Sequence, residues 1–464
     1  MAGNKLPVEQ FEIVTVLWGA RFVDRFLSMT LATILAPGNI PALANDRRLS
    51  YRIFTGENDE RRLRASPLFQ RLEQFLPVNI SVISTRPDDG KYRSAIQHYI
   101  QAMQDTRLAL APTILLQPDA IWADGALMRI AELADAGYAA IMTDGLRVIA
   151  EHFMPAFEDA SLKGADGSLS IRPRALMELA MDFIHPYEAS VTWNSKFIHD
   201  VPFRLHWPVP GGGIVTQGFC YNPIYLAPEK YDFGSVKAMD HGLVDAAITN
   251  LDRVYYCQDS DDVALVSIDE EGYSGANYKR ADRRQKILTA ASWAYREATP
   301  ENLLAATKPV RRHFAEIDEA KWRRVERVSR ASMGAVLTSR KIFLVLSLMK
   351  RQGLTLAPAM LAYLLYQGPL TGWLRIPGPM TVFAPADAAL EALGRARLND
   401  LLSSENKAEV LDMLAMHMRP GHLTVDQAAG HLGAAKIIKG DLEAEDWTLH
   451  IIDQPLVASA LERT

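Results

Sequence analysis

The sequence has few of the features that identify a protein class at once. Its 464 residues include only two cysteines, Cys220 and Cys257, which excludes a disulfide scaffold. No Cys/His spacing resembles a zinc site, and a Walker-type phosphate loop is missing. The formal net charge of −5 is mild, so the chain as a whole is not expected to attract nucleic acid. These absences favour an ordinary globular protein without a bound zinc or a nucleic-acid partner.

The first ten residues lack the apolar stretch of a secretory signal peptide. We therefore expect a cytoplasmic protein, which agrees with the low cysteine content. With 48% hydrophobic and 23% charged residues, the chain has enough apolar surface to fold. Its length suggests roughly two or three domains.

Strand-like apolar runs alternate with helical patterns through the first 150 residues. Strands are predicted over 11–19, 51–56, 79–84, 108–116 and 138–143, and helices over 22–35, 91–105 and 125–136. This alternation is typical of βαβ units that build a mainly parallel sheet. Because such a sheet binds its ligands outside the carboxyl ends of its strands, the residues that follow each strand are the candidate site residues.

Acidic residues follow two of these strand patterns. Asp119 comes after the run 113–116 and is separated from it by Gln117 and Pro118, and Asp259 and Asp261 follow the β-rich run 254–258. Carboxylates at a strand end suit Mg²⁺ or Mn²⁺, so Asp119 is the first candidate metal ligand and Asp261 the second. Asp261 can contribute only if its strand ends on the same edge. The alternatives are a turn aspartate for Asp119 and a solvated acidic turn for Asp261.

Other polar motifs have a structural and a functional interpretation. Asp240 opens a helix-like stretch and is either a general base or a helix N-cap. The three glycines 211–213 indicate a tight loop more than a phosphate cradle, because no strand-to-helix context surrounds them. His185, His199 and His206 lie among aromatics and prolines, where a histidine is usually structural.

The segment 301–351 is rich in positive charge, with 12 Lys/Arg against 5 Asp/Glu. Its apolar residues fall at helical spacing, which predicts an amphipathic basic helix. The helix either docks on the protein with a solvated basic face or makes peripheral contact with an anionic membrane. Residues 354–374 carry no charge, but prolines and glycines interrupt this run, so core packing is favoured over membrane insertion.

Three segments near the C-terminus resemble the signatures of fasciclin-like domains. They are 381–390 (TVFAPADAAL), 414–421 (LAMHMRPG) and 450–453 (HIID). Met416 stands where that family usually has tyrosine. The resemblance implies a small α+β domain over about 340–458.

The N-terminal part resembles the GT-A glycosyltransferases through 16–19 (VLWG) on the first strand and 114–119 (ILLQPD) at the fourth. That family binds a nucleoside diphosphate sugar over the first strands and holds a divalent metal with an Asp-x-Asp motif. In this chain Gln117 replaces the first acid and Asp119 is the second. The resemblance implies that the nucleotide sugar lies near a set of five residues, namely Trp18, Gly19, Arg21, Thr55 and Gly56.

The expected fold class is therefore α/β: a mainly parallel GT-A-like sheet flanked by helices, then a helical connector and a small α+β fasciclin-like domain. The expected domains cover 1–300, 301–339 and 340–464. Two functions remain open at this point. One is a metal-dependent glycosyltransferase with a nucleoside diphosphate sugar donor, Asp240 as its base and an unknown acceptor. The other is a catalytically inactive GT-A-like binding or scaffold protein, which Gln117 favours.

Overall fold

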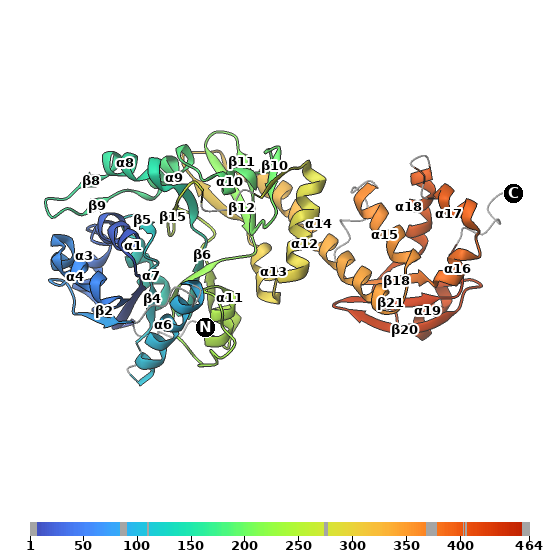
Figure 1. Ribbon diagram of the computed structural model, residues 1–464, viewed down its shortest axis with the longest axis horizontal. Helices are drawn as coiled ribbons and strands as arrows, with labels where there is room; N and C mark the ends of the chain where they lie inside the picture. Colours follow the sequence, from blue (N-terminus) through green and yellow to red (C-terminus); the bar gives the residue numbers. More distant parts are fainter. Residues whose placement is uncertain are drawn as a thin grey trace. The chain divides into compact units, whose positions relative to one another are not determined.

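The computed structural model of the chain divides into two compact units (Figure 1). The first unit contains 1–281 and 299–329, and the second contains 282–298 and 330–464. The expected connector over 301–339 holds a short helix, a strand and the first part of a long helix. The structure describes residues 7–83, 91–108, 111–272, 277–367, 378–401, 403 and 406–456.

A seven-stranded sheet forms the centre of the first unit, in the order β14-β6-β13-β4-β1-β2-β3. All neighbouring pairs are parallel except those that β13 makes with β4 and β6, so the expected mainly parallel sheet is confirmed. The strands are β1 (Gln10–Val16), β2 (Arg48–Thr55), β3 (Val78–Val82), β4 (Thr113–Leu115), β6 (Ala140–Thr143), β13 (Asn222–Leu226) and β14 (Val254–Tyr256).

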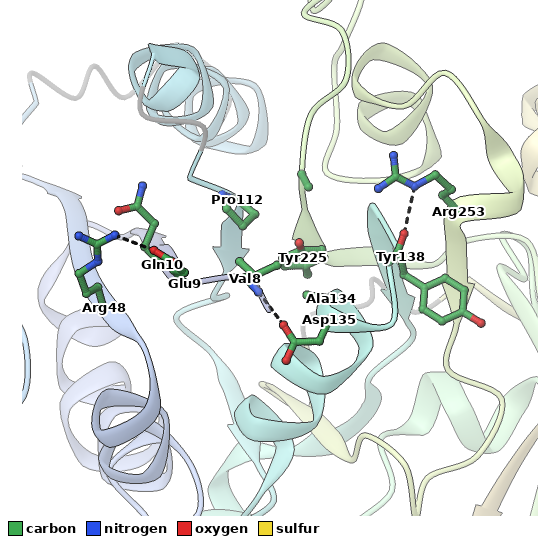
Figure 2. A pocket seen from close by; sticks show the side chains of 12 residues that line it. Val8, Glu9, Gln10, Arg48, Pro112, Ala134, Asp135, Tyr138, Tyr225 and Arg253 are labelled. Atoms are coloured by element: carbon green, nitrogen blue, oxygen red, sulfur yellow. Dashed lines mark hydrogen bonds and ion pairs between the residues drawn. The ribbon is translucent and has the colours of Figure 1, made fainter. Parts of the chain in front are cut away.

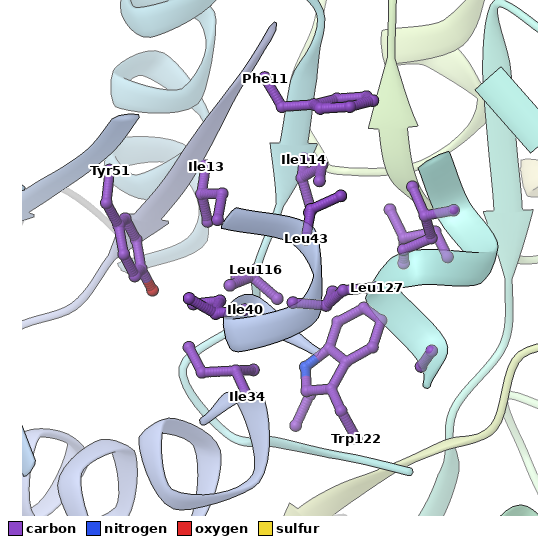
Figure 3. Close-up of a cluster of buried hydrophobic side chains, with 14 of the residues drawn as sticks. Phe11, Ile13, Ile34, Ile40, Leu43, Tyr51, Ile114, Leu116, Trp122 and Leu127 are labelled. Carbon is purple, nitrogen blue, oxygen red and sulfur yellow. The ribbon is translucent and has the colours of Figure 1, made fainter. Parts of the chain in front are cut away.

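Both faces of this sheet are buried at its central strands, which explains why β4 and β6 consist almost entirely of apolar residues. Alternate side chains of β1 enter opposite cores, with Phe11 and Ile13 on one face and Val14 and Val16 on the other. Figure 3 shows the first of these cores.

The helices of the unit are α1 (Ala20–Arg25), α2 (Leu31–Ile34), α3 (Ile40–Asp46), α4 (Glu57–Ala65), α5 (Pro67–Leu72), α6 (Lys91–Asp105), α7 (Ala126–Asp135), α8 (Ala150–Ala160), α9 (Pro173–Asp182), α10 (Pro186–Ser190), α11 (His241–Ala247) and α13 (Pro300–Ala306).

Smaller sheets surround the central one. The order β5-β15-β7 describes a three-stranded sheet in which β15 runs antiparallel to β5 and parallel to β7. In a second one, β12 pairs with β11 and β17, and the glycines 211–213 turn the chain between β11 and β12. Gly211 and Gly212 have φ near +112° and +113°, so the tight-loop interpretation is correct. The bounds are β5 (Ala120–Trp122), β7 (Leu146–Ile149), β8 (Leu162–Lys163), β9 (Leu169–Ser170), β10 (Phe197–His199), β11 (Arg204–Val209), β12 (Gly213–Gly218), β15 (Leu265–Asp269), β16 (Tyr278–Arg280) and β17 (Val310–His313).

Two helices differ from their predictions, one in its internal geometry and the other in its first residue. The helix predicted over 22–35 contains a π-helical turn, Phe26–Thr30, between α1 and α2. The basic helix, α14 (Glu319–Arg351), begins later than its apolar spacing predicted, because β17 occupies Val310–His313. Phe314 and Ile317 therefore precede the helix, and Val328 is 47% exposed instead of buried. By length and composition α14 is the one described helix that could cross a membrane, but 67% of its most apolar window is buried.

The second unit contains a four-stranded sheet in the order β19-β18-β21-β20 with helices packed on it. His417 and His450 of the fasciclin-like signatures are buried and bond to main-chain atoms, His417 to Met413 O and His450 to Leu423 O. These signature residues are therefore structural. Part of the charge-free run, 368–374, lies outside the described residues. The bounds are α12 (Arg283–Glu297), α15 (Leu356–Gln367), β18 (Met380–Pro385), α16 (Asp387–Glu391), α17 (Arg395–Leu401), α18 (Lys407–Met416), β19 (Met418–Pro420), α19 (Val425–Ala428), β20 (Ile437–Ala444) and β21 (Trp447–Ile452).

Candidate functional site

The residues expected to lie near a nucleotide sugar occupy the carboxyl ends of two adjacent parallel strands. Trp18 and Gly19 follow β1, and Thr55 and Gly56 end β2; the two strand ends are joined by a hydrogen bond from Leu17 N to Phe54 O (3.0 Å). Gly19 has φ +88°, and its amide donates to Asp59 Oδ2 at 2.7 Å. A carboxylate of α4 thus already holds this turn.

Asp119 lies at the same edge of the sheet, because β4 is the other parallel neighbour of β1. It is partly buried, and Thr30 Oγ1 holds the preceding turn by donating to Pro118 O at 2.8 Å. Burial and the nearby Asp269 carboxylate raise the pKa of Asp119 to about 6, although Arg25 and Arg147 oppose the rise. Asp119 is therefore a desolvated carboxylate facing a second acid.

Asp269 comes to Asp119 through the pairing of β15 with β5. Ser267 pairs with Ala120, and Ile268 N donates to Asp119 O at 2.9 Å, so the end of β15 lies beside Asp119. The sequence interpretation missed Asp269. The signal was present, since Asp269 follows the mostly apolar run 265–268, and Asp119 comes three positions after the run 113–116.

Asp261, the second expected metal ligand, is not brought to Asp119. It precedes β15 while Asp269 ends it, and the five residues of that strand span about 15 Å. Arg174 pairs with its carboxylate, with Nε 2.9 Å and Nη2 2.7 Å from Oδ2. Asp261 therefore lies in a separate acidic turn, where its charge is already balanced.

Two aspartates of that acidic turn nevertheless form, together with His313 of β17, the one group of three metal-ligating side chains found among the described residues. Ligand atoms of Asp259, Asp261 and His313 lie within 4.8 Å of one another, and His313 Nε2 is 3.1 Å from Asp259 Oδ2. A cation placed there would have to displace Arg174 from Asp261. The turn is a weaker metal candidate than the Asp119 edge for that reason.

Three arginines surround the Asp119 edge. Arg147 stacks over the Tyr187 ring, 5.1 Å from its centroid, and its Nε is 3.6 Å from Asp269 Oδ2. Arg21 and Arg25 both pair with Glu270, Arg25 at 3.4 Å. The carboxyl edge therefore combines acids that suit a cation with guanidinium groups that suit phosphate oxygens.

Asp240 is the N-cap of α11, as its structural interpretation predicted. Its Oδ1 accepts a hydrogen bond from Gly242 N at 2.9 Å. Burial, and to a smaller extent the Asp240 charge, raises the pKa of the Cys220 thiol to about 12, while Arg204 and Arg147 act in the opposite direction. Arg147 therefore acts electrostatically on both Cys220 and Asp119.

The histidines behave as their structural interpretation predicted. His206 is fully buried, with Nδ1 2.8 Å from Thr216 Oγ1 and Nε2 2.8 Å from Glu188 Oε2. Burial lowers the pKa of His206. Burial would raise the pKa of Glu188, but its interactions with Arg204 and His206 outweigh that effect, so the pKa of Glu188 falls below its ordinary value. This network contains a neutral ring and paired charges with no exposure to solvent, as a structural core requires.

A cavity of about 420 Å³ lies elsewhere in the unit, at the amino ends of the parallel strands (Figure 2). It is lined by residues that precede β1 and β6, among them Val8 and Tyr138, and by Asp135, whose Oδ1 accepts from Val8 N at 2.7 Å. The cavity is therefore at the opposite edge from Asp119. Ligands of open α/β sheets bind at the carboxyl edge, so the cavity is not the candidate site.

Comparison with protein families identifies a fasciclin domain at residues 359–431, which confirms the C-terminal resemblance. Protein sll1483 of Synechocystis sp. is 31% identical over 100 residues, which cover 17% of this chain and 56% of that protein. The chain therefore spans about half the length of this curated relative.

The solved structures similar to this chain include two sugar transferases. A mannosyltransferase of Pyrobaculum calidifontis, in complex with GDP-Man and Mn²⁺, is 12% identical over 87% of this chain and 85% of that one, with a TM-score of 0.26. Mouse xyloside xylosyltransferase 1 is 11% identical over 32% of this chain and 58% of that one, with a TM-score of 0.23.

A Bacillus anthracis protein described as a glucose-1-phosphate thymidylyltransferase is 11% identical over 30% of this chain and 55% of that one, with a TM-score of 0.20. At TM-scores this low, the function of the chain has to follow from its own residues.

Proposed function

We propose that the first unit binds a nucleoside diphosphate sugar at the carboxyl edge of its central sheet and transfers the sugar to an acceptor. The observation that carries the proposal is the convergence of Asp119 and Asp269 with Arg25 and Arg147 at that edge. Trp18, Gly19, Thr55 and Gly56 follow the adjacent strands and would receive the nucleoside, as the GT-A resemblance implies. These residues do not indicate the identity of the acceptor.

Sugar transfer leaves negative charge on the departing diphosphate, so the site must supply positive charge there. Arg147 stands at 24% exposure beside Asp269, and Arg25 at 12% exposure beside Glu270. Both guanidinium groups can donate to phosphate oxygens if the diphosphate replaces their carboxylate partners. Arg21, at 50% exposure, pairs with Glu270 and would be the first to meet an incoming ligand.

The acids at this edge fit a divalent cation. Mg²⁺ and Mn²⁺ prefer oxygen ligands from one or two carboxylates together with phosphate oxygens, and Asp119 and Asp269 are such a pair. Burial and, second to it, repulsion by Asp269 raise the pKa of Asp119, and a cation between the two acids would relieve the repulsion. When bound, the cation would neutralise charge on the leaving diphosphate.

Asp240 is the proposed base for the acceptor hydroxyl. Gly242 N engages its Oδ1, and among the described residues its Oδ2 has no hydrogen-bond donor, so this oxygen is available for a proton. Its N-cap role fixes the carboxylate in place. The two interpretations of Asp240 are therefore compatible.

A catalytically inactive binding protein is the second candidate, and two observations favour it. Gln117 cannot supply the first carboxylate of an Asp-x-Asp motif. Arg147 also lies where it partly neutralises Asp269, which reduces the need for a cation. The two candidates share nucleotide binding and differ in turnover.

Release of nucleoside diphosphate from UDP- and GDP-sugars, followed with and without Mn²⁺, tests the proposal. We expect slow release by hydrolysis, because enzymes of this kind pass the sugar to water when the acceptor is absent. Asp119→Ala should abolish the release, and Asp261→Ala, a matched loss of one carboxylate, should leave it unchanged. Nucleotide binding without any turnover would favour the inactive binding protein, and equal activity in the two variants would contradict the assignment of Asp119.

A further inference from the structure

The N-terminal half of α14 exposes a row of arginines. Arg323, Arg324 and Arg327 are exposed, with Lys321 at the edge of the same surface, and the opposite side of the helix is buried through Trp322. Residues 323 and 327 are four positions apart, so their side chains are neighbours on one face. We call Arg323, Arg324 and Arg327 the basic face.

The charge of the basic face is largely uncompensated. Arg324 and Arg327 make no ion pair or side-chain hydrogen bond among the described residues. Arg323 has only an electrostatic attraction to Glu319, one turn earlier on the helix. Glu319 itself is engaged by Arg311 at 2.8 Å, and so is Glu326 at 2.6 Å. The acids nearest the basic face in sequence are thus directed toward Arg311.

The basic face lies on a chain whose net charge is −5, so its local charge is opposite in sign to that of the whole chain. Several exposed arginines of the first unit have carboxylate partners, as Arg61 has with Glu57 and Arg62 with Asp24. A face without such partners can meet an anionic ligand without first losing an internal ion pair. It is complementary in charge to a phosphate-rich surface.

We propose that the basic face of α14 binds the surface of an anionic phospholipid membrane. Phospholipid head groups present many phosphates in a plane, and three arginines along one straight helix can contact such a plane together. The proposal is independent of the glycosyl transfer proposed above.

The neighbours of the basic face favour lipid over nucleic acid. Val328, which is 47% exposed, adds an uncharged apolar side chain that can rest against the head-group region. Aromatic side chains, on which single-stranded nucleic acids stack their bases, are lacking at the exposed positions of 320–334. The charge-free run at 354–367 is not needed as an anchor, since Leu354, Met360 and Leu365 are buried.

Co-sedimentation of the full chain with vesicles tests the proposal. The vesicles contain equal parts of phosphatidylcholine and phosphatidylglycerol, and vesicles of phosphatidylcholine alone are the reference. We expect binding to the anionic vesicles at low salt and release at high salt, because exposed charges are screened. Each arginine contributes about a fivefold factor to partitioning, so Arg323→Gln, Arg324→Gln and Arg327→Gln together should weaken binding on the order of a hundredfold.

Two further variants separate the basic face from overall charge. Lys163→Gln, Lys237→Gln and Lys436→Gln together remove the same three positive charges from other exposed positions and should change binding less than about twofold. The triple arginine-to-lysine variant should still bind, because membrane attraction needs charge rather than a guanidinium group. Failure of the full chain to sediment at low salt, equal losses in the two triple Gln variants, or tighter binding of an RNA oligonucleotide than of the vesicles would each overturn the proposal.

Discussion

Replacing Asp119 by Asn should stabilise the protein in the absence of ligand. The Asp119 carboxylate is held beside Asp269 in a desolvated position, so its ionised form is unfavourable in the folded state. Asparagine keeps the shape of the side chain and removes the charge. A site built to hold a cation between two acids should carry this cost when the cation is absent.

The size of the effect follows from the pKa of Asp119. Folding raises that pKa from 3.8 to about 6, which corresponds to about 3 kcal/mol at 1.36 kcal/mol per pH unit. Asp119 is only partly buried, so solvent screening reduces the expected gain to about 1–2 kcal/mol. Because the folded-state pKa is raised, the protonated form contributes stability that is complete below pH 3.8 and lost as the pH rises through about 6.

Urea unfolding of the wild type and of Asp119→Asn at several pH values measures this difference. We expect the variant to be more stable above pH 6 and equal to the wild type near pH 4. Asp269→Asn is the control, since it removes the repelling charge and should lower the pKa of Asp119. A variant less stable than the wild type above pH 6 would mean that attraction to Arg25 and Arg147 dominates, and the reasoning would be refuted.

Two other predictions concern the cores of the units. Glu188→Gln removes one of the two buried carboxylates that pair with Arg204, the other being Asp144, and should lower the free energy of unfolding by about 2 kcal/mol, as measured in urea; a loss below about 1 kcal/mol would show that the network is hydrated. The fragment 282–464 should unfold in one cooperative thermal transition at a higher temperature than 340–464, which lacks α12 and residues 330–339 of α14; equal melting temperatures would show that these two segments add nothing to the stability of this unit.

The sheet and its carboxyl edge could be predicted from the sequence because they depend on local patterns. Strands buried on both faces are apolar throughout, and the residue after each strand lies at the edge by geometry alone. Asp119 was found in this way, and Gly19 was found through the GT-A resemblance. The fasciclin-like unit was found from the residues that form its buried strands.

The partners of Asp119 could not be predicted, because they depend on how distant strands pair. Asp261 and Asp269 both flank the same strand, and only the register of β15 against β5 decides which one meets Asp119. The start of the basic helix was predicted too early for a similar reason, because the residues of β17 pair with β12 and are therefore a strand. The place of α12 in the second unit depends on contacts such as that of Tyr295 with Phe343, whose rings are 6.1 Å apart.

In the proposed site, Asp119 and Asp269 hold a divalent cation against the diphosphate of a nucleotide. Calorimetric titration of the full chain with UDP and GDP, in the presence and absence of Mn²⁺, tests it most directly. We expect at least one nucleotide to bind in the presence of Mn²⁺ only, and we expect this binding to be lost in Asp119→Ala and retained in Asp261→Ala. Binding that is the same with and without Mn²⁺, or that survives Asp119→Ala, would contradict it.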